Sequence, residues 1–267
     1  MHRFFRIVVY IFAAIGFILV VGYVAIRLGW TNTKGVIDTQ ENFFQEEIAS
    51  STQAWVNEEE WQVLKEAILR DKEDIEKAAA VVGISGRLIV TPLVVEQLRL
   101  YYSDRELFKK AFAPLKVLGN QSQFSWGVMG IKQETAKEIE DNLKDPASPW
   151  YLGKAMENIL DFKTDNPDQE RFERLTSENS RYYSYLYTAL LMRELETQWK
   201  KAGFPIGDKP EILATLFNIG FENSKPHADP LSGGALITIN DVNYSFGSLA
   251  ASFYNSEELE KEFPSTH

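Results

Sequence analysis

The sequence predicts a mainly α-helical protein with an N-terminal transmembrane helix, one folded domain and one small β-hairpin. Three observations predict this class. An uncharged apolar run extends from Ile7 to Ile26. Apolar residues recur at helical spacing through most of the remaining chain. Near the C-terminus, two short apolar segments flank Asn240-Asp241, a sequence typical of a tight hairpin turn.

The apolar run is about as long as a helix that crosses a bilayer, which needs ~20 apolar residues. Arg3 and Arg6 precede it, so the positive-inside rule predicts a cytoplasmic N-terminus and an extracytoplasmic domain. The alternative is a cleaved signal peptide. The sequence after the run, Ile-Arg-Leu-Gly-Trp, is a poor cleavage site, which favours an uncleaved single-pass anchor in the cell membrane over residues 1–30.

Composition limits the classes of function. The chain has 267 residues, a formal net charge of −10 and no cysteine. The negative charge and the absence of a basic patch argue against a nucleic-acid partner. The absence of cysteine excludes disulfides and a thiol nucleophile. We expect a linker at 31–55, one domain at 56–256 and a flexible acidic tail at 257–267.

Helical spacing predicts the elements of the domain in order. Asn57 and Glu60 have the form of a capping box that opens a single helix over Glu58–Val82, and Gly83 ends it. The helical stretch Ser85–Tyr102 follows, in which Pro92 either begins the helix or kinks it. Further helices are expected at Asp104–Phe112, Glu134–Leu143, Trp150–Phe162, from Asn166-Pro167 to about Leu175, and at Ser180–Ala202, Pro210–Asn218 and Phe246–Tyr254.

Glu96 is the first candidate for catalysis. Val94, Val95 and Leu98 surround it in the sequence. Apolar surroundings disfavour the anion, so such a carboxylic acid can keep its proton and donate it to a glycosidic oxygen. The alternative is a solvent-facing glutamate that pairs with Arg99 three residues on.

Two further segments contain candidate ligand-binding groups. Ser125-Trp126-Gly127 permits a sharp turn whose amides and hydroxyl could orient a carboxylate or a sugar amide. The alternative is a loop whose Trp and Met side chains belong to the core. Asn218 ends a helix before Gly220 and could bond a sugar N-acetyl group, or simply cap the helix.

Other chemistries have less support. The histidines are His2, His227 and His267, and only His227 lies in the expected domain, which excludes a site of several histidines for a metal. A Ser-His-Asp triad would have to use His227. Neighbouring aspartates lack the spacing of a calcium loop. We therefore expect no metal and no cofactor.

Taken together, these segments resemble the lysozyme-like superfamily, especially soluble-type lytic transglycosylases and goose-type lysozymes. The family pattern is a catalytic Glu ending a helix, then Ser-x-Gly-Leu-Met-Gln-Ile, a Thr-Ala helix start, and later Tyr-Asn-x-Gly. The resemblance covers about Glu96 to Gly220, and Gln97, Gly130 and Phe217 stand where the family has Ser, Gln and Tyr. The matching residues are Glu96, Ser125, Gly127, Met129, Ile131, Thr135, Ala136, Asn218 and Gly220.

The resemblance implies a lysozyme-like helical domain that cleaves peptidoglycan glycan strands at the β-1,4 bond between N-acetylmuramic acid and N-acetylglucosamine. Glu96 would be the general acid/base, and Ser125 would help to orient it. Met129 and Asn218 would line the sugar subsites, within a substrate-binding set that also includes Gly127, Ile131 and Phe217.

The mechanism implied is that of a lytic transglycosylase. One carboxyl protonates the bridging oxygen and then accepts the proton of the muramyl 6-hydroxyl, so no second acid is needed, whereas a hydrolase usually pairs two carboxylates. One alternative is a catalytically inactive lysozyme-like domain that binds glycan or acts as an envelope scaffold. Another is an unrelated membrane-tethered interaction domain with a solvent-facing Glu96.

Overall fold

The computed structural model describes residues 17, 53–102 and 127–265. Within these residues the protein is mainly helical, with eight α-helices, one 3-10 turn and one sheet of two strands. The elements are α2 Glu59–Arg70, α3 Lys72–Val82, α4 Gly86–Tyr101, α6 Gln133–Lys144, α7 Pro167–Thr176, α8 Tyr182–Lys201, α9 Pro210–Ile219, η1 Phe221–Asn223, β1 Leu236–Ile239, β2 Val242–Ser245 and α10 Phe246–Tyr254.

No helix among the described residues combines the length and the apolar character that a bilayer crossing requires. The apolar run at 7–26, which carries the prediction of a membrane anchor, lies outside the described residues except for Phe17. Most of the predicted linker and the predicted helix Asp104–Phe112 also lie outside them.

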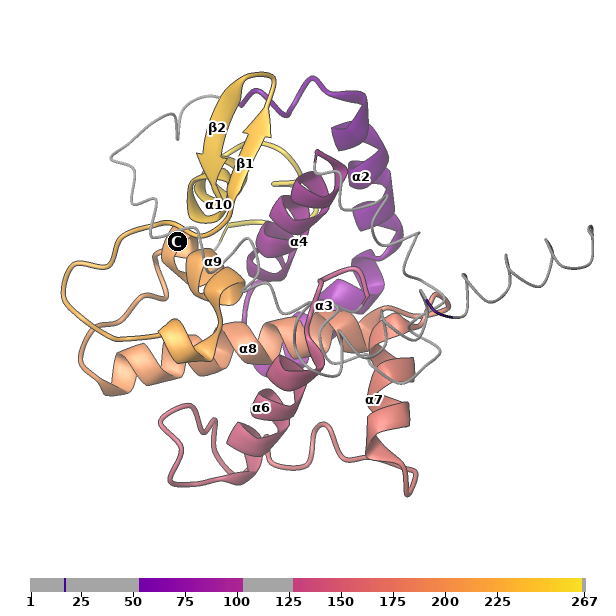
Figure 1. Ribbon diagram of the computed structural model, residues 1–267, viewed down its shortest axis with the longest axis vertical. Helices are drawn as coiled ribbons and strands as arrows, with labels where there is room; N and C mark the ends of the chain where they lie inside the picture. Colours follow the sequence, from indigo (N-terminus) through magenta and orange to yellow (C-terminus); the bar gives the residue numbers. More distant parts are fainter. Residues whose placement is uncertain (1–16, 18–52, 103–126, 266–267) are drawn as a thin grey trace, which may run out of the picture.

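Helix α8 is the central element of the fold. Figure 1 shows α8 crossing the middle of the molecule, and it packs against α3, α4, α6, α7 and α9. Its side chains are buried on several faces, for example Tyr185, Leu190 and Trp199. A helix that is apolar around most of its circumference must lie inside the protein. This confirms the helix that the sequence predicts at Ser180–Ala202, to within two residues.

The predicted hairpin is confirmed. Strands β1 and β2 pair antiparallel, with Ile239 opposite Val242. The two turn residues Asn240 and Asp241 have φ of 50° and 62°, which suits a type I′ turn because both central residues need positive φ. Ser245 then caps α10, which lies beside the hairpin in Figure 1.

The single helix predicted at Glu58–Val82 is wrong, because the chain bends at Asp71 between α2 and α3. The Asp71 carboxylate accepts hydrogen bonds from Arg181 Nη1 and the Tyr185 hydroxyl, both at 2.7 Å. These bonds to a distant part of the chain stabilise the bend. The predicted capping box is also wrong, since Glu58 is the N-cap and makes no side-chain cap bond.

Helix α4 begins earlier than Pro92. Ser85 is its N-cap, and the Ser85 hydroxyl accepts a bond from the Leu88 amide. Pro92 therefore lies inside the helix and does not begin it. The structure is compatible with the other prediction, in which Pro92 kinks the helix.

The helix predicted at Trp150–Phe162 is wrong, because this stretch forms turns. The side chain of Arg174 donates to the carbonyls of Leu160 and Asp161 at 2.8 and 2.7 Å. Backbone acceptors can be satisfied by a side chain as well as by a helix. Trp150 packs edge-on against Phe221, with the ring centroids 5.3 Å apart.

Both predicted boundaries of the domain need correction. Trp55, placed in the linker by the sequence, is fully buried and packs edge-on against Trp61. The tail is not loose over 257–265, because Leu259 and Phe263 are buried in the core. Apolar side chains at both ends of the domain thus extend the folded body beyond 56–256.

Candidate functional site

Glu96 lies in the second half of α4 and is 4% exposed. Its carboxylate is paired with Arg99 on the same helix: Arg99 Nη2 lies 2.6 Å from Oε1, and Nε lies 3.0 Å from Oε2. The pair between Glu96 and Arg99, which the sequence predicts as the alternative to catalysis, is therefore present. The solvent-facing position that this alternative gives to Glu96 is wrong. The bidentate form is the strongest geometry for an arginine and a carboxylate.

The turn at 127–131 packs between α4 and α8. The side-chain amide of Gln97 donates to the Val128 carbonyl, which joins the turn to α4. On the other side, a Cβ atom at Gly127 would lie 2.0 Å from the Leu175 carbonyl oxygen and 2.9 Å from Ser184 Oγ. Glycine at 127 is therefore required by close packing as well as by its φ of 63°.

Gly130 lies directly against Glu96. It has a φ of 63°, and a Cβ atom there would be 2.5 Å from Glu96 Oε1 and 3.0 Å from Cδ. A longer side chain at 130 is incompatible with Glu96 in this position. The contact gives a physical reason for glycine where the resembling family has glutamine, and it brings together two segments that are far apart in the sequence.

Met129 and Ile131 are 1% and 3% exposed and belong to the hydrophobic core. We therefore assign both side chains to packing of the turn, and not to contact with a sugar. Ser125, the predicted orienting hydroxyl, lies outside the described residues.

Phe217 and Asn218 join the end of α9 to the start of α10 and to the residue before β1. Asn218 Oδ1 accepts a bond from the Ala235 amide at 2.9 Å. Phe217 stacks on Phe246, with ring centroids 6.2 Å apart and an angle of 29° between the planes. Neither residue is bonded to Glu96 in the described structure, although α4 and α9 pack together. The geometry thus brings Glu96 and the turn together, and gives Asn218 a structural partner.

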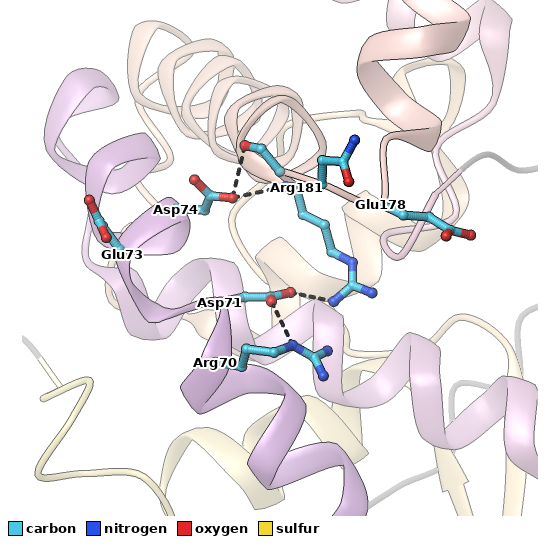
Figure 2. Close-up of a pocket in the computed structure, with 8 residues that line it drawn as sticks. Arg70, Asp71, Glu73, Asp74, Glu178 and Arg181 are labelled. Carbon is cyan, nitrogen blue, oxygen red and sulfur yellow. Dashed lines mark hydrogen bonds and ion pairs between the residues drawn. The ribbon is translucent and has the colours of Figure 1, made fainter.

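A polar cavity lies elsewhere, where α2 ends and α3 begins, opposite the residues before α8. Its volume is about 670 Å³. Figure 2 shows Arg181 reaching toward Asp71, and Asp74 bonded to the start of α8. None of the predicted site residues lines it. The lining residues are Arg70, Asp71, Glu73, Asp74, Glu178, Asn179, Ser180 and Arg181.

The two aspartates in this cavity have structural partners. Asp74 Oδ2 accepts bonds from the Arg181 amide at 2.8 Å and the Ser180 hydroxyl at 3.0 Å, so it satisfies a donor at the N-terminus of α8. Asp71 holds Arg181 and Tyr185. We assign this cluster to the attachment of α3 to α8. Over 53–102 and 127–265, no group of three or more His, Asp or Glu side chains is arranged to hold a metal ion.

Sequence reasoning missed another buried carboxyl, Glu194 on α8. It is fully buried, and this burial raises its pKa well above the ordinary value of 4.5. Asn142 donates to Oε2 at 3.2 Å, while Oε1 has no hydrogen-bond partner among the described residues. The segment Met-Arg-Glu-Leu-Glu-Thr looks like the polar end of a helix, so the sequence contains no signal that distinguishes Glu194.

We expect Glu194→Gln to stabilise the protein at neutral pH. Because the folded-state pKa is raised, the folded protein retains a proton that the unfolded chain releases above about pH 4.5. The free energy of unfolding of the wild type therefore falls by about 1.4 kcal/mol per pH unit as the pH rises from the unfolded-state pKa toward the raised folded-state pKa. Glutamine has no such proton. Urea unfolding between pH 4 and 8 gives the free energy of unfolding of wild type and of Glu194→Gln as a function of pH. The two plots should coincide at pH 4 and diverge above it.

Glu196→Gln is the matched control, because Glu196 is two residues away on α8 and is partly exposed beside Arg193. This variant removes one carboxylate from the same helix and leaves Glu194 in place, so it shows the effect of losing a carboxylate that is not fully buried. Glu138 contributes a smaller slope in both variants, since burial and the nearby Glu222 raise its pKa. Parallel curves for wild type and Glu194→Gln across the whole range would contradict the assignment.

Comparisons with models of protein families, with curated proteins and with solved structures gave no match to this chain.

Proposed function

We propose that this protein is a membrane-anchored peptidoglycan lytic transglycosylase with a lysozyme-like domain, and that Glu96 is its single acid/base. The observation that carries the proposal is the contact between Glu96 and Gly130. Residues from two separate parts of the resembling pattern, the glutamate and the glycine-containing turn, meet at one place. A buried carboxyl against a tight turn is an arrangement suited to proton transfer at an oriented sugar.

In the proposed reaction Glu96 gives a proton to the glycosidic oxygen between N-acetylmuramic acid and N-acetylglucosamine. The C–O bond of the muramyl residue breaks, and the N-acetylglucosamine hydroxyl leaves. Glu96 then accepts the proton of the muramyl 6-hydroxyl as that oxygen bonds to C1. The products are a 1,6-anhydromuramyl end and a free hydroxyl, so that no water is consumed.

The remaining parts of the proposal follow from the sequence. The apolar run at 7–26 anchors the chain in the cell membrane with the domain outside, where glycan strands are the partner. The turn at 127–131, which Gln97 holds to α4, positions the Glu96 carboxyl.

The test is digestion of purified peptidoglycan by the full-length protein in detergent, with the products read by mass spectrometry. Wild type should release anhydromuramyl fragments. Glu96→Gln should lower their rate by about 10²–10⁴, the usual contribution of general acid–base catalysis. Glu196→Gln, which also removes one carboxylate from an Arg–Glu pair at three-residue spacing, should leave the rate unchanged.

A second function is favoured by one observation. Because Arg99 occupies both oxygens of Glu96, the domain also suits a lysozyme-like protein that binds glycan without cutting it. In that case wild type and Glu96→Gln would both sediment with insoluble peptidoglycan, and neither would release fragments under conditions where an active transglycosylase does. Reducing ends in place of anhydromuramyl ends would instead indicate a hydrolase.

A further inference from the structure

The partner of Glu96 occupies the atoms that the proposed reaction needs. Arg99 donates one N–H to each carboxylate oxygen, at 2.6 and 3.0 Å, and the two side chains are only 12% and 5% exposed. A proton donor has to lie about 3 Å from the oxygen that it protonates, and the guanidinium takes up that position at both carboxylate oxygens. Acid catalysis by Glu96 therefore requires that this pair opens.

The geometry determines which of the two side chains moves. Gly130 lies against Oε1, so the carboxyl has no room to retreat toward the turn. Arg99 is near the end of α4, and Glu96 is its bonded partner among the described residues. Swinging of the guanidinium away from Glu96 is therefore the movement that frees the carboxyl.

A guanidinium that leaves its carboxylate in a mostly buried position needs another acceptor, because an unpaired buried charge is strongly unfavourable. Planar, bidentate recognition by arginine suits a second carboxylate best. The replacement has to come with the ligand, at the moment when the ligand reaches Glu96. This points to a substrate that has an acidic group next to the scissile bond.

Resting on the proposed function, we propose that Arg99 exchanges Glu96 for a carboxylate of the substrate, and that this exchange makes the enzyme selective for acidic glycan. The free lactyl carboxyl of N-acetylmuramic acid has the required chemistry. A glycan without such a group must break the ion pair without compensation. Arg99 is thus a specificity-determining residue that acts through Glu96, and strands whose muramyl carboxyls are blocked as amides, as they are where a stem peptide is attached, are cleaved more slowly.

The test compares two forms of the same peptide-free glycan strands, one with free muramyl carboxyls and one with these carboxyls converted to amides. Anhydromuramyl products are counted for the full-length wild type, Arg99→Met, Arg99→Lys and Arg193→Met. Arg193 is the matched control, since it forms a partly exposed pair with Glu196 at the same three-residue spacing. Thermal unfolding establishes that each variant is folded, and Arg99→Lys keeps the charge if Arg99→Met does not fold.

We expect wild type and Arg193→Met to prefer the acidic strands about tenfold in kcat/KM, which corresponds to about 1.4 kcal/mol of differential binding. In Arg99→Met this ratio should fall toward one, mainly through a lower KM for the amidated strands, because no ion pair then has to open. Arg99→Lys should lie between the two, since lysine lacks the bidentate fork.

A purely structural role of Arg99 would lower the rates on both substrates equally and leave their ratio unchanged, and that outcome overturns the inference while the proposed function stands. Cleavage of neither substrate by wild type or by any Arg99 variant overturns the proposed function, and the inference with it. An inert wild type together with an active Arg99→Met also overturns the inference, because the acidic strands would then fail to open the ion pair.

Discussion

Arg87→Met is expected to destabilise the protein by about 3–5 kcal/mol, because it leaves a set of buried carbonyls without a donor. Arg87 is 0% exposed, and all of its donor nitrogens are used. Five backbone carbonyls beyond α4 accept its bonds at 2.8–3.2 Å, and Glu260 Oε2 lies 3.2 Å from Nη1. These carbonyls belong to Phe253, Tyr254, Ser256, Glu258 and Phe263.

The bonds matter because α10 ends there and the chain that follows forms no regular element. The last carbonyls of a helix have no partner within it. Arg87 supplies donors for the last two, those of Phe253 and Tyr254, and for three carbonyls beyond the helix. Its guanidinium also lies over the Phe253 ring at 4.9 Å. Lysine has three donors in a different geometry, so Arg87→Lys should recover only a small part of the lost stability.

Thermal and urea unfolding measure this effect. In a domain of this size the expected loss lowers the unfolding midpoint by roughly 10 °C. Arg193→Met is the control, since Arg193 is partly exposed and makes one ion pair, and surface pairs contribute about 0–1 kcal/mol. A loss in Arg87→Met that is no larger than in Arg193→Met would show that the C-terminal segment does not depend on Arg87.

Gly127→Ala is expected to cost about 4 kcal/mol, through strain and collision together. Alanine at a φ of 63° carries a conformational penalty of roughly 1–2 kcal/mol. Its Cβ would also lie 2.0 Å from the carbonyl oxygen of Leu175, which is backbone and cannot rotate away. Forcing extra volume into a packed site costs a further 1–3 kcal/mol, roughly.

Gly83→Ala separates the two contributions. Gly83 is the left-handed C-cap of α3 with a φ of 76°, and a Cβ there would meet no atom within 4 Å. It should therefore cost only the conformational penalty. Urea unfolding of both variants gives the difference that belongs to the collision. Equal losses of unfolding free energy in the two variants would mean that the turn at 127–131 shifts at no cost to make room for the Cβ atom. In that case the turn does not hold Glu96 in place.

Local signals in the sequence were sufficient for the elements whose stability is mostly local. The hairpin needs two adjacent residues that tolerate positive φ, and Asn240-Asp241 supplies them. The helix at 246–254 follows a serine that caps it, and α8 has apolar residues on most of its faces. In each case the backbone preference and the hydrophobic pattern predict the same structure.

Long-range bonds decided where the sequence prediction failed. Asp71 interrupts a continuous helical pattern because Arg181 and Tyr185 bind its carboxylate. Turns replace the predicted helix at 150–162, where Arg174 donates to two of its carbonyls. A side chain more than ten residues away supplies these bonds, and no window of local sequence contains that information.

The candidate site divides in the same way. The sequence by itself determined which residue types are present: one carboxyl in an apolar helix, an arginine three residues on, and a turn rich in glycine. Only the tertiary structure decided that Glu96 faces Gly130, that Met129 and Ile131 are core residues, and that Asn218 is bonded to Ala235. The physical reason is that burial and contact are properties of the packed chain, whereas propensity and spacing are properties of its local segments.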